Sequence, residues 1–133
     1  MENTISFDLV SPEKLIFTDD VGMIIVPGKG GDIGVLPNHS KLLSSLRPGK
    51  IMVYGENKNL IKSFFVSGGF VEINSAKCIV LAENASDIND LDKQSLEQEI
   101  QSLQSENDEK SKNDLIIALS KVEALESNYY IKL

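Results

Sequence analysis

The chain has 133 residues, with 20 acidic and 13 basic side chains and a net charge of −7. An acidic chain with a single arginine lacks the basic surface that binds nucleic acid or anionic lipid, so we expect neither as a direct partner. No window is apolar enough to span a membrane, the N-terminus does not resemble a signal peptide, and one cysteine cannot form an internal disulfide bond. We therefore expect a soluble protein that reaches a membrane only indirectly, through a partner.

The first strands follow from the hydropathy pattern. Ile5, Phe7 and Leu9 alternate with polar residues, which predicts a strand with one buried face. The nearly continuous apolar run over residues 21–26 predicts a strand that is buried on both faces. Turn-forming residues then recur at short intervals as far as Gly69, as is typical of an antiparallel β-sandwich.

The segment over residues 30–43 reads Gly-Gly-Asp-Ile-Gly-Val-Leu-Pro-Asn-His-Ser-Lys-Leu-Leu, and Arg-Pro-Gly over residues 47–49 closes it. Its three glycines allow positive φ angles and close backbone approach, so we predict a shaped loop. We expect Leu42 and Leu43 to support this loop from the core. The loop holds His39, the only histidine of the chain.

Residue types that could carry chemistry are too few and too scattered for a catalytic or metal site. No second histidine and no Gly-x-Ser-x-Gly turn accompany His39 and Ser40, so we expect no catalytic residue. One histidine and one cysteine do not make a tetrahedral metal site. The glycine-rich residues 28–31 lack the spacing of a phosphate-binding loop and no helix follows them, so we expect no cofactor.

The pattern changes to that of helices after residue 86. Apolar residues recur at helical spacing over residues 91–103, with Asp90 or Asp92 as the N-cap. Residues 105–113 are polar throughout and predict the connection to a second helix, whose apolar stripe spans residues 115–125. Each helix has one apolar face, so the two must pack against each other or against another surface.

Turn-formers and charge divide the chain at the same place. All nine glycines and all four prolines lie between Pro12 and Gly69. Residues 1–86 carry eight Lys or Arg and nine Asp or Glu, whereas residues 87–133 carry five and eleven. We therefore predict a two-part α+β fold, with an antiparallel β-sandwich over residues 1–86 and a two-helix antiparallel hairpin over residues 87–133.

Two strings at a defined separation resemble the epsilon subunit of bacterial rotary F-type ATP synthases. The first is the string over residues 30–49 described above, and the second is Phe-Phe-Val-Ser-Gly-Gly-Phe-Val-Glu-Ile over residues 64–73. The family carries a G-E-L-G-[IV]-x-P-x-H-x-x-L-L…P-G loop and a [YF]-[VL]-S-G-G-[FI]-x-E-[VI] hairpin at this separation. The resemblance extends from about Ile5 to Glu83 and weakens after Asp92.

The resemblance implies a non-catalytic subunit of the central stalk, or rotor. Such a subunit couples the gamma subunit to the membrane ring of c subunits during proton-driven ATP synthesis. It is a peripheral protein on the cytoplasmic face of the bacterial inner membrane.

The resemblance also assigns an interface to the glycine-rich segment. Asp32 occupies the position of the family's loop acid between Gly31 and Gly34, which makes it the expected contact to the ring. His39 matches the family histidine, which lies close to the gamma contact or braces the loop that makes it.

Members of the family carry [IL]-D-x-x-R-A at the start of the hairpin, where it contributes to an ATP-binding site. Leu91 and Asp92 match this motif, but Ser95 replaces its arginine and Leu96 its alanine. Serine lacks the planar, bidentate donors with which arginine binds phosphate. The sequence therefore disfavours ATP binding, and Asp92 is otherwise a helix cap.

The family's second role is to inhibit ATP hydrolysis, by insertion of the last helix between gamma and the catalytic alpha and beta subunits. Those subunits present acidic loops to it. Residues 114–133 carry three acids and two lysines, so the contact would be repulsive. We expect weak or absent inhibition. The alternative function is a free-standing β-sandwich adaptor that binds an unrelated helical partner, and co-purification with gamma separates the two.

Overall fold

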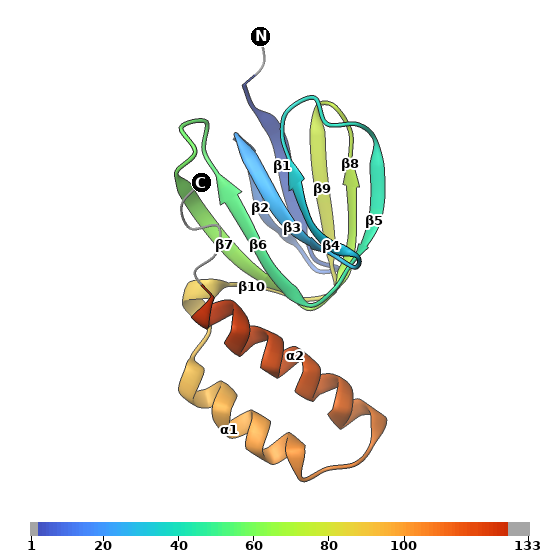
Figure 1. Ribbon diagram of the computed structural model, residues 1–133, viewed down its shortest axis with the longest axis vertical. Coiled ribbons are helices and arrows are strands. Elements are labelled where there is room, and N and C mark those ends of the chain that lie inside the picture. The colour runs from blue at the N-terminus through green and yellow to red at the C-terminus, as the bar shows by residue number, and fades with distance from the viewer. Residues whose placement is uncertain (1–2, 128–133) are drawn as a thin grey trace.

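The computed structural model describes residues 3–127, which form a β-sandwich followed by two helices (Figure 1). This confirms the α+β class. The strands are β1 (Ile5–Val10), β2 (Leu15–Val21), β3 (Met23–Gly28), β4 (Gly31–Val35), β5 (Leu42–Leu46), β6 (Gly49–Tyr54), β7 (Leu60–Val66), β8 (Gly69–Ile73), β9 (Lys77–Ala82) and β10 (Ala85–Asp87). A 3-10 turn, η1 (Ile88–Asp90), leads into the helices α1 (Lys93–Gln104) and α2 (Glu109–Glu126).

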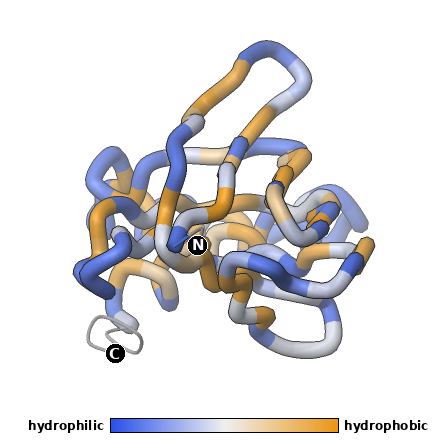
Figure 2. The backbone as a smooth tube through the Cα atoms, turned by 90° about the horizontal axis from the view of Figure 1, so that it is seen from above, coloured by the Kyte–Doolittle hydropathy of each residue, from blue (hydrophilic) through white to orange (hydrophobic). Residues whose placement is uncertain are grey.

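The strands pair in the order β10-β7-β6-β3-β5-β8-β9-β1-β2, and β4 pairs with β3 beside this path. Neighbours in this order are antiparallel except for β1 and β9, which run parallel. The sheet folds back on itself as two layers (Figure 1). Apolar and polar stretches alternate along the strands in the view from above (Figure 2), which is the pattern that two facing layers require.

The core lies between the two layers and follows the alternation of the sequence. Phe7 and Leu9 of β1 have no exposed surface, as the period of two predicts. In β3, Ile24 and Val26 face this core, and Ile25 is buried with Met52 and Tyr54 in a second cluster. The prediction that this strand is buried on both faces is therefore confirmed.

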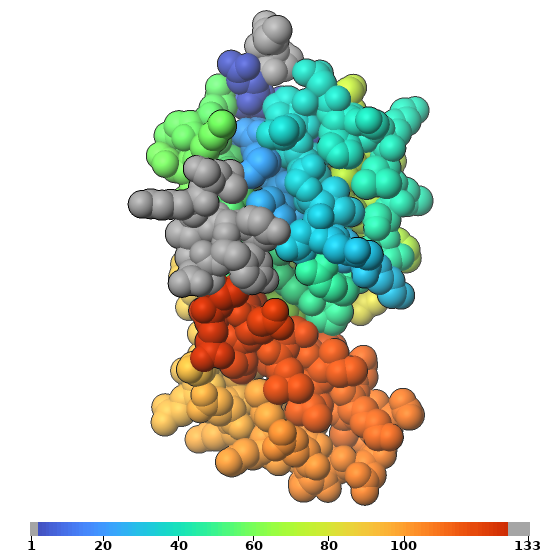
Figure 3. Space-filling model, in the orientation of Figure 1, coloured from blue at the N-terminus to red at the C-terminus, as the bar shows by residue number. Residues whose placement is uncertain are grey.

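The two helices form a separate lobe beneath the sandwich (Figure 3). Asp92 is the N-cap of α1, and its carboxylate accepts a hydrogen bond from Ser95 N at 3.2 Å. It is one of the two N-caps that the sequence predicts. Neither helix within residues 3–127 has the length and apolar character that a membrane span requires.

The predicted connection over residues 105–113 is too long, because α2 begins at Glu109. Asp108 caps this helix by accepting a hydrogen bond from Ser111 N at 2.9 Å. Ser111 is buried, and its hydroxyl donates to the carboxylate of Glu106. A polar first turn can therefore be helical here, since its side chains satisfy the free N–H groups that begin every helix.

Candidate functional site

The predicted contact acid, Asp32, lies in strand β4 and not in a loop. Its partner in β3 is Pro27, and Gly28 pairs with Gly31 across the tight turn that joins the two strands. Gly31 has a φ of 142°, a conformation that side-chain-bearing residues rarely adopt. The shaped segment over residues 30–43 is therefore not one loop, because a strand takes up its first half; the loop that holds His39 lies between β4 and β5.

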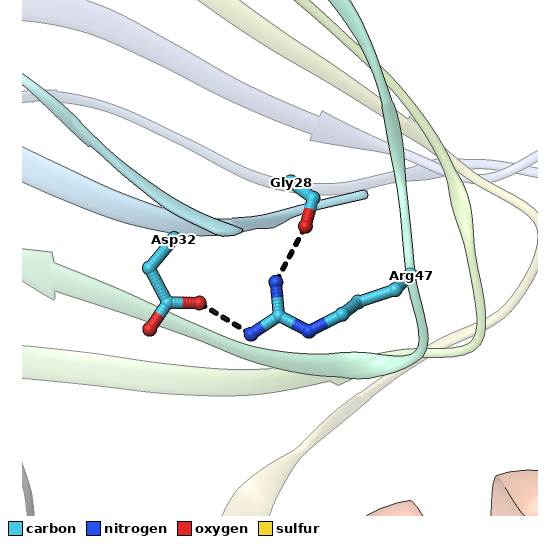
Figure 4. A network of polar contacts seen from close by, with 3 residues as sticks. All are labelled: Gly28, Asp32 and Arg47. Atoms are coloured by element: carbon cyan, nitrogen blue, oxygen red, sulfur yellow. Dashed lines mark hydrogen bonds and ion pairs between the residues drawn. The ribbon is translucent and has the colours of Figure 1, made fainter. Parts of the chain in front are cut away.

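Arg47 holds this turn from the neighbouring strand connection (Figure 4). Its Nη1 donates to the carbonyl oxygen of Gly28 and its Nη2 to Oδ1 of Asp32, each at 2.5 Å. The Asp32 side chain is 25% exposed, so its carboxylate is still within reach of a partner. Sequence reasoning missed Arg47 as part of the site. The signal was present, because it is the only arginine and belongs to the Arg-Pro-Gly string that closes the motif.

His39 lies at the opposite end of β4 from Asp32, in the connection to β5 (Figure 1). Its Nδ1 is 2.6 Å from the carbonyl oxygen of Ser40. The preceding residue, Asn38, has a φ of 67°, and its N–H donates to the carbonyl oxygen of Ser75. The structure therefore does not bring His39 and Asp32 together. A partner contacts both only if it covers the length of the sandwich.

Leu42 and Leu43 are exposed to 37% and 70%, so the prediction that they support the loop from the core is wrong. Leu46, at the other end of the same strand, is the buried leucine of β5. Alternation in a strand shows that two faces exist but does not show which face a second layer covers.

Leu43 belongs to a larger surface, the outer apolar face, which we define by Leu15, Leu43, Phe70 and Leu81. Each of these side chains is between 52% and 70% exposed. Strand register places Leu15, Phe70 and Leu81 on one side of the sheet, because Phe70 lies opposite Leu81, Leu81 opposite Val10, and Val10 opposite Leu15. Leu43 is on the same side, since it lies opposite Glu72, two residues along β8 from Phe70. A groove runs along this face and is lined by Val10, Pro12, Phe70 and Leu81 among others.

The motif remnant at the start of the hairpin serves as a cap. The Asp92 carboxylate accepts from both the hydroxyl and the N–H of Ser95, at 2.6 and 3.2 Å. These hydrogen bonds, the hydroxyl's first, hold the pKa of Asp92 below its ordinary value. The serine that replaces the motif arginine thus bonds to the neighbouring aspartate, and Leu91 before it is half-buried.

Within residues 3–127, no three His, Cys, Asp or Glu side chains converge in a way that could hold a metal ion. Cys78 is buried in the core, as its alternation with Val80 predicts, and burial raises the pKa of its thiol to about 12. This thiol is therefore neither a metal ligand nor a nucleophile at neutral pH.

Comparison with known proteins places this architecture in a family. The model of the family described as "ATP synthase, Delta/Epsilon chain, beta-sandwich domain" matches residues 4–88. The chain belongs to the ATP synthase delta/epsilon chain family. The ATP synthase epsilon chain of Rhodospirillum centenum is 45% identical over 107 residues, which cover 77% of this chain and 73% of that one. The epsilon chain of Maricaulis maris is 35% identical over 131 residues, which cover 96% and 97%.

Solved structures extend the likeness to the hairpin. A chain in the mitochondrial ATP synthase of Euglena gracilis, a structure that includes F1 and the c-ring, has a TM-score of 0.80 at 24% identity, covering 95% of this chain and 81% of its own. A chain in the central stalk and c-ring of the Tetrahymena thermophila mitochondrial enzyme has a TM-score of 0.59 at 16% identity, covering 91% and 92%. At these identities the likeness shows the fold alone. The family predicted from the two strings is confirmed by the family model and the relatives.

Proposed function

We propose that the chain is a non-catalytic rotor subunit in the central stalk of a bacterial F-type ATP synthase. It couples the gamma subunit to the ring of c subunits during proton-driven ATP synthesis. In this role it is a peripheral protein on the cytoplasmic face of the inner membrane. The epsilon-chain relatives support this proposal, as does the likeness to a chain in a central-stalk and c-ring assembly.

The outer apolar face is the observation that carries the proposal. Soluble monomers rarely expose several large apolar side chains on one face, because apolar surface in water is unfavourable. A face of this kind is therefore expected to be covered by a partner. The β-strands beneath it are fixed by a fully buried core, so the surface is rigid and preformed. We assign this face to the gamma subunit, since a rotor component needs a broad contact that does not slip.

The β3–β4 turn is the proposed contact to the c-ring. Gly31 and Gly34 carry no side chain, so the backbone there can approach a partner closely, and Asp32 presents a carboxylate between them. Arg47 fixes the position of that carboxylate and presents a positive charge beside it. An exposed ion pair of this kind adjusts the match to polar ring loops more than it adds affinity. His39 braces the connection at the far end of β4.

Co-purification tests the gamma contact. The full chain is co-expressed with the gamma subunit of the same organism, and the two are expected to elute as one complex. Leu43→Asp combined with Phe70→Asp places two charges in the outer apolar face and is expected to abolish the complex. Ile61→Asp is the matched control, because Ile61 is 47% exposed in β7, outside this face, and should leave binding intact.

The outcomes separate this function from its alternative. Failure of the unchanged chain to bind gamma, with capture of an unrelated helical protein instead, would identify an adaptor. Binding that survives both aspartates would place gamma on another surface and overturn the assignment of the face.

The hairpin is proposed to inhibit ATP hydrolysis weakly or not at all. Residues 114–133 contain three acids against two lysines, and Glu123 and Glu126 are exposed on α2. This charge would repel the acidic loops of the catalytic alpha and beta subunits. Deletion of the residues after Asp87 is expected to leave the ATPase rate of the assembled complex nearly unchanged, and a several-fold rise would contradict this.

A further inference from the structure

Helix α2 ends against strand β6, and a lysine of that strand reaches the end of the helix. The Nζ atom of Lys50 donates to the carbonyl oxygen of Ala124 at 2.9 Å and to that of Ser127 at 3.2 Å. Ala124 lies in the last turn of α2, and Ser127 is its C-cap. Lys50 is 74 residues before Ala124 in the chain, so this contact joins the sandwich to the hairpin.

The end of α2 is stabilised by a nearby cation, which the last turn of the helix itself does not provide. The last carbonyl groups of a helix have no partner within it, and together they carry a partial negative charge. The last turn of α2 contains no basic residue. Lys50 therefore supplies from β6 the positive charge that a lysine or arginine of the helix would otherwise supply.

Burial of the Lys50 ammonium is costly, and the two carbonyl groups at the end of α2 offset part of this cost. Burial lowers the pKa of Lys50 below its ordinary value, which shows that the site disfavours the charged form. A charged donor that is partly removed from water needs hydrogen-bond acceptors. Two carbonyl oxygens at the same helix end provide them.

Among residues 3–127, a cation–π contact also joins the hairpin to the sandwich. Lys121 of α2 places its Nζ 5.8 Å from the ring centroid of Phe65 in β7. In this contact the lysine belongs to the hairpin and its partner to the sandwich, whereas Lys50 belongs to the sandwich and its partners to the hairpin. Beside Lys50, a cleft separates the β5–β6 turn from Ser120 and Glu123 of the helix.

We propose that Lys50 is the residue that docks the helical hairpin onto the sandwich, by capping the C-terminal end of α2 from strand β6. Its ammonium sets where the hairpin lies, while the fold of each part rests on contacts of its own. This inference goes beyond the proposed rotor function and does not depend on it.

The test measures the position of the hairpin in the isolated full chain. Nitroxide labels on Glu56→Cys in the β6–β7 connection and Lys112→Cys in α2 report the distance between the two parts, since both positions are exposed. Cys78 is buried with a raised thiol pKa, so it does not compete for the label. Lys50→Met removes the charge and keeps most of the chain length, whereas Lys50→Arg keeps a cation with several donors.

Lys50→Met is expected to broaden the label distance distribution and to speed amide hydrogen exchange in α2 about tenfold. Lys50→Arg is expected to restore most of the protection. Lys77→Met is the matched control, because Lys77 is a strand lysine paired with Asp8 at 3.3 Å, and it should leave the hairpin unchanged.

Two readouts keep the test decisive. Amide protection in β3 and β9 shows that the sandwich is still folded in each variant. An unchanged distance distribution with unchanged α2 protection in folded Lys50→Met would overturn the proposal, and so would an equal effect of Lys77→Met.

Discussion

Buried side chains differ in size between the sandwich and the hairpin. In the sandwich, Phe7, Ile24 and Val53 have no exposed surface. Among the described residues of the hairpin, Leu96 is the one large apolar side chain that is buried, and α2 buries Ser111 and two alanines. Large buried side chains contribute most to stability, so the sandwich holds itself together more strongly than the hairpin does.

The hairpin compensates for its small core with polar contacts at its ends. Asp92 and Asp108 cap the two helices, Lys93 joins them through Glu126 at 2.8 Å, and Lys50 caps α2 from the sandwich. Such contacts are individually weak and depend on charge and pH. The two regions should therefore unfold separately, with the hairpin first.

Removal of a core ring should give the largest effect. Phe7→Ala empties a fully buried position and is expected to destabilise the sandwich by about 4 kcal/mol. Urea unfolding, monitored by far-ultraviolet circular dichroism, measures this loss. Leu15→Ala, at a side chain that is 54% exposed, should stay within about 0.5 kcal/mol of the unchanged protein. Equal effects of the two substitutions would contradict the assigned core.

A matched truncation in the hairpin should have a smaller and local effect. Leu96→Ala is expected to cost about 2 kcal/mol, at the low end for a buried leucine, because solvent lies close to this helix. Amide hydrogen exchange should speed up throughout α1 and α2, while exchange in β3 and β9 stays as it was. Loss of protection in the strands as well would show that the two regions unfold as one unit.

The strands could be predicted from the sequence because their burial alternates with a period of two. Phe7 and Cys78 show this directly, and both have no exposed surface. The role of Leu43 could not be predicted in this way, since its exposure depends on which face another layer covers. Arg47 contacts Asp32 and Gly28, which precede it by 15 and 19 positions in the sequence. No local sequence pattern predicts contacts over such separations. The start of α2 depends on the buried hydroxyl of Ser111, which finds its partner in the exposed carboxylate of Glu106.

Acid should separate the two regions. The Lys62 ammonium and the N–H of Asn89 lower the pKa of Asp87, and Ser95 and Ser111, through their hydroxyl and N–H groups, lower the pKa values of Asp92 and Asp108. A lowered pKa in the folded state adds stability above the unfolded value of about 4, and this stability is lost as the pH falls through the folded value.

These three aspartates serve the linker and the helix caps, so the hairpin should lose amide protection below about pH 4. In the sandwich, the hydroxyl of Thr18 lowers the pKa of Asp8, but the large core does not titrate. We expect the strands to stay protected at a pH at which the helices exchange freely. Helices and strands that lose protection at the same pH would contradict this order.

The smallest expected effect is that of ATP, which should not bind the hairpin. ATP carries several negative charges, and residues 87–133 contain eleven acids, five lysines and no arginine. The Asp92 carboxylate is occupied as the cap of α1 and accepts both hydrogen bonds that Ser95 offers. A nucleotide would therefore meet repulsion without the bidentate donors that bind phosphate.

Amide signals near Leu91 and Asp92, followed during an ATP titration, are expected not to move. Ser95→Arg is the positive control, since Ser95 is exposed. This variant restores the arginine of the motif, and any shift that appears only with it would identify the missing guanidinium as the reason. Saturable shifts in the unchanged chain would instead show that lysines and backbone N–H groups suffice, and the hairpin would then be stabilised by ligand in addition to its caps.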